Sequence, residues 1–465
     1  MSCERKGPLR SRNAADFGVL PGNAPAENTR NLQALLDEGG EIAVEEPGEY
    51  GIDDMLVIRG GTALRFGKGT ALRRESDRGG ALINRGALTG ETDSDILVEG
   101  LRLICNGCNG TVAEVVPGLR GQLNFYRVKN LTLRDVACPD LPKISFFIHL
   151  SNWENVLVDG IEVAGLKDGL HVNRGAHLRV VNGLFRTFDD PIALNAHDYP
   201  SACPEFGWIS DVVIEHCVDL PEDSSVGFFA RLLGGAWSGW RRGNLYRHSD
   251  AVVAPNGNVY RCIARQDLME YRSECEPCHD RGDRAYPDGL VWRYIQHDAA
   301  CDCGCENVVF RDIILKKTRP VAFSLHYDDD AYSRSCYPGA IAAPQRNILF
   351  DRLVCDGASF KILAHAKTPV DTLRVVNSTL RAETVVNLSD SVFAEAGENR
   401  LTRVGLANNV ILLPEGAEGV TAVRAGQGRR ALLNVNGTIK TGAFPLLVEG
   451  DARRTDDDAL NPRRS

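Results

Sequence analysis

A short segment of alternating apolar and polar residues recurs along this chain, followed in most copies by Asn, Asp or Gly. It occurs as ILVEG (96–100), LTLRD (131–135), VLVDG (156–160), LRVVN (178–182), VVIEH (212–216), VVFRD (308–312), ILFDR (348–352) and LRVVN (373–377). The alternation has a period of two residues, so each copy is predicted to be a short strand with one buried face.

The spacing of the copies identifies the repeat unit. The second apolar positions are Val98, Leu133, Val158, Val180, Ile214, Phe310, Phe350 and Val375, separated by 35, 25, 22, 34, 96, 40 and 25 residues. The shortest separations match one coil of a parallel β-helix, and the longer ones fit coils with longer loops. A β-sandwich is the alternative, but its strands should follow one another about every 8–12 residues. The chain is therefore predicted to be all-β, a right-handed single-stranded parallel β-helix.

The N-terminal segment predicts a cap for the open end of this solenoid. A helix is expected from about Thr29 to Leu36, ended by Gly39 and Gly40, and EIAVEEPGEY (41–50) is expected to be a strand. The first coil has an apolar end that needs such a cover. The segment resembles the cap of the pectin lyase-like superfamily through Asp16-Phe17-Gly18, the helix, the Gly pair and Pro47-Gly48-Glu49-Tyr50. With the coil pattern, the resemblance covers most of the chain outside residues 235–300.

The 96-residue interval contains no coil pattern after about Gly235. The segment VVAPNGNVYRCI predicts a hairpin around Asn256 and Gly257. The 96-residue interval as a whole holds three of the five tryptophans, Trp237, Trp240 and Trp292. The aromatic side chains are either exposed platforms for sugar rings or the core of a small module. We expect residues 1–234 to form the β-helix with its cap, 235–300 an inserted aromatic-rich β module, and 301–465 the C-terminal coils.

Three acidic residues fall in equivalent positions of successive coils. Asp168 follows Val158 by ten residues, Asp190 follows Val180 by ten, and Asp189 lies beside it. Asp168 and Asp190 are 22 residues apart, so they should stack on strands about 4.8 Å apart. Carboxylates this close repel, and at least one should keep its proton near neutral pH. An Asp beside Gly or Pro often serves only a turn, but three aligned acids favour acid/base catalysis.

The segments LKDGLHV (166–172) and FDDPIALN (188–195) resemble the acidic motifs of the polygalacturonase family, glycoside hydrolase family 28. The resemblance implies inverting hydrolysis of a polysaccharide or oligosaccharide without a cofactor or metal. Asp168, Asp189 and Asp190 would be catalytic, with Asp189 or Asp190 as the general acid. The family's Gly-His-Gly segment and Arg-x-Lys pair have no counterparts, and Arg231 is the nearest cation. This departure leaves neutral sugars open as substrates.

Other polar side chains are expected to line the same groove and bind the carbohydrate. His149 and His171 are again 22 residues apart, which places them in register on neighbouring coils. The remaining candidates are Asn195, His197, Arg231 and His326, with Asp198 also available.

The fourteen cysteines leave three interpretations open. Cys275, Cys278, Cys301, Cys303 and Cys305, with His279 nearby, could bind zinc, form disulfides or remain free thiols. Cys138, Cys217 and Cys355 fall in or just after the coil pattern, so they are expected to be buried.

The charge and hydropathy of the chain exclude some partners. Its 62 acidic and 53 basic residues give a net charge of −9 with no basic cluster, which argues against nucleic acid. No apolar run is long enough for a membrane helix, and the first residues lack the apolar region of a signal peptide. The protein therefore either stays in the cell or has lost a leader, and its oligomeric state is open. A Ca²⁺-dependent polysaccharide lyase and a non-catalytic, tail-spike-like binding protein are the alternative functions.

Overall fold

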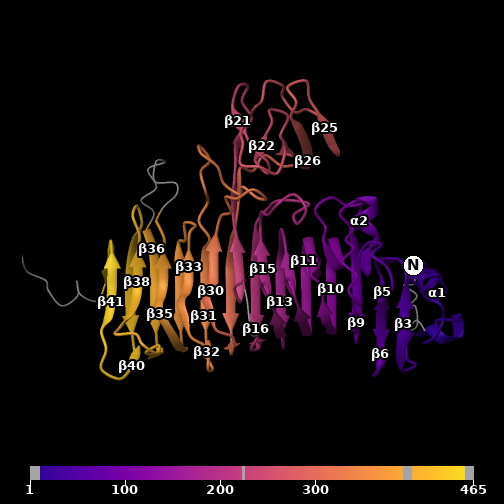
Figure 1. Cartoon of the computed structure of the whole chain (residues 1–465), viewed down its shortest axis with the longest axis horizontal. Helices are drawn as coiled ribbons and strands as arrows, with labels where there is room; N and C mark the ends of the chain where they lie inside the picture. Colours follow the sequence, from indigo (N-terminus) through magenta and orange to yellow (C-terminus); the bar gives the residue numbers. More distant parts are fainter. Residues whose placement is uncertain (1–10, 223–225, 391–400, 456–465) are drawn as a thin grey trace, which may run out of the picture.

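The computed structural model describes residues 11–222, 226–390 and 401–455. Its main feature is a right-handed parallel β-helix whose coils stack along the long axis of the molecule (Figure 1). Thirty of its strands belong to one continuous sheet, in which each strand pairs in parallel with the equivalent strand of the next coil. The prediction of a parallel β-helix is confirmed.

The predicted register is also the observed one. Leu133 pairs with Val158, Val158 with Val180, and Val180 with Ile214. Ile214 pairs with Phe310, so the 96-residue interval is one coil that carries an insertion. All eight repeat positions are fully buried, because the inward side chains of each coil pack against those of its neighbours.

The elements of the first coils are β1 Arg12–Asn13, η1 Ala14–Phe17, α1 Pro25–Glu38, β2 Gly40–Val44, β3 Gly48–Ile52, β4 Leu56–Ile58, β5 Thr62–Phe66, β6 Thr70–Arg74, β7 Leu82–Asn84, α2 Arg85–Thr89, β8 Asp93–Glu99 and β9 Leu103–Ile104. The central coils contain β10 Gly121–Leu141, β11 Phe146–Gly165, β12 Leu170–Val172, β13 Gly175–Val181, β14 Leu184–Thr187, β15 Ile192–Asn195, β16 Ile209–Glu215, β17 Val218–Asp219 and β18 Ala230–Leu233. The coils after the insertion contain β28 Cys305–Arg311, β29 Ile314–Leu315, β30 Arg319–His326, β31 Arg346–Asp351, β32 Val354–Cys355, β33 Phe360–Ala366, β34 Thr372–Val376, β35 Thr379–Leu388, β36 Leu401–Ala407, β37 Val410–Leu412, β38 Val420–Ala425, β39 Arg430–Asn436, β40 Ile439–Thr441, β41 Leu446–Gly450 and β42 Ala452–Arg454.

A left-handed residue stands directly before the repeat segment in seven coils, and we call this set the turn ladder. Its members are Asp95, Asn130, Asn155, His177, Asp211, Asn307 and Asn347, with φ between 51° and 66°. Asn and Asp tolerate this conformation better than other side chains. The amides also bond between coils, for example from Nδ2 of Asn155 to Oδ1 of Asn130 at 3.3 Å. The turn ladder therefore fixes where each coil bends.

The N-terminal cap differs from its prediction in two details. Helix α1 begins at Pro25, four residues before the expected start, because Pro at the first helical position fits its geometry. It buries Leu32, Leu35 and Leu36 against the first coils. The single strand expected over 41–50 is wrong: β2 ends at Val44 and β3 begins at Gly48, because Pro47 lacks an amide hydrogen for the strand ladder.

Residues 238–297 contain a separate five-stranded sheet and a two-stranded sheet, and they project from the side of the β-helix (Figure 1). The strands of the insertion are β19 Gly235–Ala236, β20 Ser238–Gly239, β21 Leu245–Tyr246, β22 Ala251–Val253, β23 Asn258–Cys262, β24 Tyr271–Arg272, β25 Asp283–Ala285, β26 Val291–His297 and β27 Asp302–Cys303. The predicted hairpin is present as antiparallel β22 and β23. Trp237, Tyr246, Tyr260 and Trp292 are buried, so these four belong to a core.

Among the described residues, no helix has both the length and the apolar character needed to cross a membrane.

Candidate active site

The acid cluster consists of Asp168, Asp189 and Asp190, which reach one place from two successive coils. Asp168 lies just before β12, and the Asp pair lies just before β15. These two strands are neighbours, with Leu170 opposite Ile192. One carboxylate oxygen from each acid lies within 4.8 Å of the other two. The register therefore brings the three predicted acids together.

Two cations are paired with the acid cluster. The Lys167 ammonium forms an ion pair with Asp189 and lies 3.8 Å from Oδ1 of Asp168. Nε of Arg231, on β18, lies 3.2 Å from Oδ2 of Asp190. The Phe228 amide donates to the other Asp190 oxygen at 2.7 Å. The cluster therefore holds charges of both signs.

A buried histidine links the acid cluster to a fourth carboxylate. His171 Nδ1 lies 2.8 Å from Oδ2 of Asp168, and its Nε2 lies 3.3 Å from Oδ2 of Asp198. Asp198 also accepts from the Asn195 amide, and Arg231 lies 3.5 Å from it. These contacts fix the orientation of the Asp168 side chain.

Burial separates the acids. The side chains of Asp168 and Asp190 are 1% and 2% exposed, whereas that of Asp189 is 21% exposed. Asp189 is therefore the acid most open to a substrate. Oδ1 of Asp168 has no hydrogen-bond donor among the described residues.

The pKa values of the acids differ for identifiable reasons. Burial raises the pKa of Asp190 to about 7, against the opposing charge of Arg231. Burial and the charge of Asp168 also raise the pKa of Asp189, although Lys167 opposes this. Burial acts in the same direction on Asp168, but Lys167 and His171 outweigh it and lower its pKa. The site thus combines one ionised carboxylate with two that hold protons more readily.

A cavity of about 560 Å³ adjoins the acid cluster through Arg231, and none of the three acids lines it directly. Arg231 belongs to both, because it lines the cavity and contacts Asp190. The other lining residues are Thr111, Ala113, Arg120, Ile144, Tyr199, Ser201, Gln266, Asp328, Asp330, Tyr332 and Ser333. They come from loops of several coils and, with Gln266, from the insertion.

The predicted carbohydrate-binding residues occupy different places. His149 and His171 pair in register as expected, but both are fully buried. Burial, followed by the neighbouring His171, lowers the pKa of His149 to about 3. Asn195 is also fully buried. Of these three, only His171 contacts the acid cluster, through Asp168, whereas Arg231 lines the cavity.

The other two predicted residues lie at the sides of the site. His197 is buried and stacks on Phe206, with ring centroids 4.3 Å apart. His326 Nε2 lies 3.1 Å from Oδ1 of Asp328, a residue that lines the cavity. Two residues near the site were not predicted from the sequence. Lys167 lies within the LKDG motif itself, whereas the coil pattern gives no signal for Tyr332.

The cysteines in and just after the insertion do not assemble a metal site among the described residues. Cys275, Cys278, Cys301, Cys303 and Cys305 are free thiols, and none of them lies in a group of three potential ligands within the described ranges. Both ring nitrogens of His279 face oxygens, of Tyr286 and of Gly282. Of the three interpretations, the structure has the free thiols.

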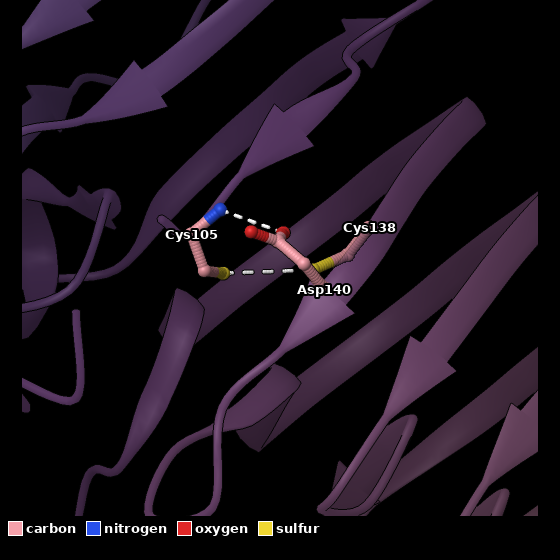
Figure 2. Close-up of side chains that lie close together, drawn as sticks. All are labelled: Cys105, Cys138 and Asp140. Carbon is pink, nitrogen blue, oxygen red and sulfur yellow. Dashed lines mark hydrogen bonds between the residues drawn. The ribbon is translucent and has the colours of Figure 1, made fainter. Parts of the chain in front are cut away.

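Another cysteine cluster lies in the first coils, where Cys105 and Cys138 have sulfur atoms 3.5 Å apart (Figure 2). Cys138 is buried as expected. Asp140 lies close enough to be a third ligand, but its two oxygens already accept the amides of Cys105 and Asn106, each at 2.8 Å. The position of Asp140 is thus explained by these backbone contacts.

The chain was compared with known proteins by sequence and by fold. No protein-family model matches it, and no curated protein sequence does. An exopolygalacturonase from Thermotoga maritima is similar in fold, with a TM-score of 0.52 and 13% identity, over 94% of this chain and 93% of that one.

Two further solved structures show the same likeness. The family 28 exopolygalacturonase of Yersinia enterocolitica has a TM-score of 0.51 and 12% identity, over 95% of this chain and 77% of that one. The tailspike protein of E. coli bacteriophage HK620 has a TM-score of 0.51 and 9% identity, over 93% and 67%. The chain thus has the fold of the pectin lyase-like β-helix proteins.

Proposed function

We propose that this protein is a glycoside hydrolase that cleaves a polysaccharide or oligosaccharide with the acid cluster. The observation that carries the proposal is the convergence of Asp168, Asp189 and Asp190 beside a cavity of about 560 Å³. Glycoside hydrolysis needs one acid to protonate the leaving oxygen and one carboxylate to assist the attack on the sugar. Environments that push the pKa values of neighbouring carboxyl groups apart supply this division.

Asp189 is the proposed proton donor. It is the most exposed of the three acids, and burial together with Asp168 raises its pKa. Asp168 is the proposed base, because its pKa is lowered and its Oδ1 is left without a hydrogen-bond donor among the described residues. The Lys167 ammonium reduces the electrostatic repulsion between Asp168 and Asp189. The Arg231 guanidinium offsets the charge of Asp190 in the same way.

The proposal includes inversion of the anomeric carbon. A retaining enzyme needs a carboxylate that reaches the sugar, whereas Asp168 and Asp190 are almost completely buried. We therefore propose that a water molecule, and not a carboxylate, attacks the anomeric carbon. The oxygens lie within 4.8 Å, closer than the roughly 6.5–9.5 Å typical of inverting carboxyl pairs, so burial and not spacing supports inversion. Proton NMR of the first anomer released tests it.

The Ca²⁺-dependent lyase is less well supported by the same contacts. A cation bound by the acid cluster would meet the ammonium of Lys167, which already forms an ion pair with Asp189. A lyase also releases an unsaturated, ultraviolet-absorbing sugar, and we expect none.

The test is a screen for new reducing ends on plant, algal and host glycans, followed by Asp189→Asn on the best substrate. Loss of the proton donor should lower kcat/KM about 1,000-fold with the fold retained by circular dichroism. Asp211→Asn is the matched control, because Asp211 belongs to the turn ladder, where Asn occupies the same place in other coils. Hydrolysis by Asp189→Asn at the rate of the control would disprove the assignment.

A further inference from the structure

The cavity beside the acid cluster has an exposed aromatic ring in its wall. Tyr332 is 63% exposed and lines the cavity together with Arg231. Asp330 accepts the amides of Tyr332 and Ser333 at 2.7 and 2.8 Å, which fixes the backbone of this turn. Most aromatic side chains of a folded protein are buried, so an exposed ring in a cavity wall suits a ligand with an apolar face.

The loop that carries Tyr332 is held by the insertion. Arg247 forms an ion pair with Asp329, and Arg334 lies 3.3 Å from both Asp250 and Glu270. The Tyr337 hydroxyl donates to the carbonyl of Ala251. Residues 238–297 therefore support one wall of the cavity.

The cations of this region are already occupied by protein groups. Arg231 contacts Asp190 and Asp198, and Lys167 contacts Asp189. Arg120 donates to the Ile144 carbonyl at 2.7 Å and to the Tyr199 hydroxyl at 2.8 Å. An acidic sugar would have to compete with aspartate carboxylates for Arg231 and Lys167, and with a neutral carbonyl and hydroxyl for Arg120.

Carboxylates outnumber these cations. Asp328 and Asp330 line the cavity, and Asp198 lies behind Arg231. With the acid cluster, six aspartates lie near Lys167, Arg120 and Arg231; among them Asp190 holds a proton near neutral pH, and Asp328 lies 3.1 Å from His326. Such a field repels anions and becomes stronger where water is excluded.

We infer that the cavity is a subsite for an uncharged sugar of a neutral oligosaccharide, with Tyr332 as the platform on which the ring stacks. This inference rests on the proposed function and adds its substrate class. The C–H face of a pyranose would lie on Tyr332, and Asp330 and Gln266 would accept or donate hydrogen bonds at the hydroxyl groups. A uronic acid would bring a carboxylate to the same acidic wall.

The test measures binding and cleavage separately with matched probes. Hexagalacturonate and its fully methyl-esterified form share sugar and linkage but differ in charge, and cellohexaose, maltohexaose, xylohexaose and mannohexaose extend the neutral set. Calorimetry on the full chain gives each Kd, and reducing-end release gives cleavage. A neutral probe should bind at least tenfold more tightly than hexagalacturonate. Tyr332→Ala should weaken it at least tenfold, and Tyr332→Phe less than twofold.

Ile341→Ala is the control, because Ile341 lies in the same loop and is 66% exposed but does not line the cavity; its Kd should change less than twofold. Tightest binding of hexagalacturonate, no binding of any probe, or an unchanged Kd in Tyr332→Ala would overturn the inference. A neutral probe that binds without cleavage would contradict only the hydrolase proposal, whereas cleavage of hexagalacturonate alone would contradict only the substrate class.

Discussion

The turn ladder and the acid cluster are both stacks of polar side chains in register on successive coils, but their energetics are opposite. In the turn ladder, exposed amides bond from coil to coil, as between Asn347 and Asn307 at 3.0 Å. An amide both donates and accepts, so a stack of amides satisfies itself. In the acid cluster, Asp168 and Asp190 are buried and can only accept when ionised.

This difference separates a stack that stabilises itself from one that needs compensating charge. A carboxylate stack needs cations or bound protons to exist, and here Lys167 and Arg231 provide the charge while Asp190 keeps a proton up to about pH 7. Stability alone would favour amides at these positions. Buried carboxyl groups with shifted pKa values are typical of functional sites, which supports the proposed role of the acid cluster.

Removal of the Lys167 ammonium from the acid cluster should have the largest effect, on kcat/KM and on its pH dependence. Lys167→Met leaves Asp168 and Asp189 facing each other without the ammonium, so the pKa of both should rise. We expect kcat/KM to fall at least about 100-fold at neutral pH. The acidic limb of the pH profile of kcat/KM should move to higher pH. The profile is measured on the substrate found in the screen.

Lys129→Met is the matched control, because Lys129 forms an inter-coil pair with Glu154 at 2.7 Å on exposed positions of β10 and β11. Its pH profile should follow that of the unmodified protein. A Lys167→Met profile that also does so would assign this lysine a purely structural role.

Neutralisation of Asp190 should change how stability depends on pH. The folded pKa of about 7 lies above the unfolded value of about 3.9, so the folded state holds the extra proton between them. Stability should therefore fall as pH rises through this window, by about 2 kcal/mol between pH 5 and 7. Asp190→Asn should lose this part of the slope, as measured by chemical unfolding at several pH values. An equal slope in both proteins would show that Asp190 is not protonated in the folded state.

The sequence was sufficient for the parts of the site that depend on periodicity. The 22 residues between Asp168 and Asp190 predicted their convergence, because every coil must return to the same register. The same reasoning placed His149 next to His171. It could not predict their burial, because alternation only assigns them to the outward side of their strands.

The loops that cover these positions have no period. The Arg120 amide donates to His149 at 3.0 Å, and the Ala202 carbonyl lies 3.2 Å from His171. Both contacts come from irregular segments whose paths are set by local packing. The ring of Tyr332 enters the cavity wall for the same reason, through a loop anchored on the insertion. The convergence of the acid cluster was thus predictable from the repeats, and the loops that form the cavity wall were not.

The smallest effect is expected in the turn ladder itself. Asn155 has φ of 58° and donates to Asn130 at 3.3 Å on an exposed edge. Asn155→Ala should lower stability by about 1 kcal/mol, because Ala is strained in the left-handed conformation. Asn155→Gly should lose only a few tenths, since Gly adopts this conformation freely. Thermal unfolding measures both, and hydrolysis should be unchanged in each. An Asn155→Gly loss equal to that of Asn155→Ala would mean that the inter-coil amide bond, and not the backbone conformation, is what the ladder contributes.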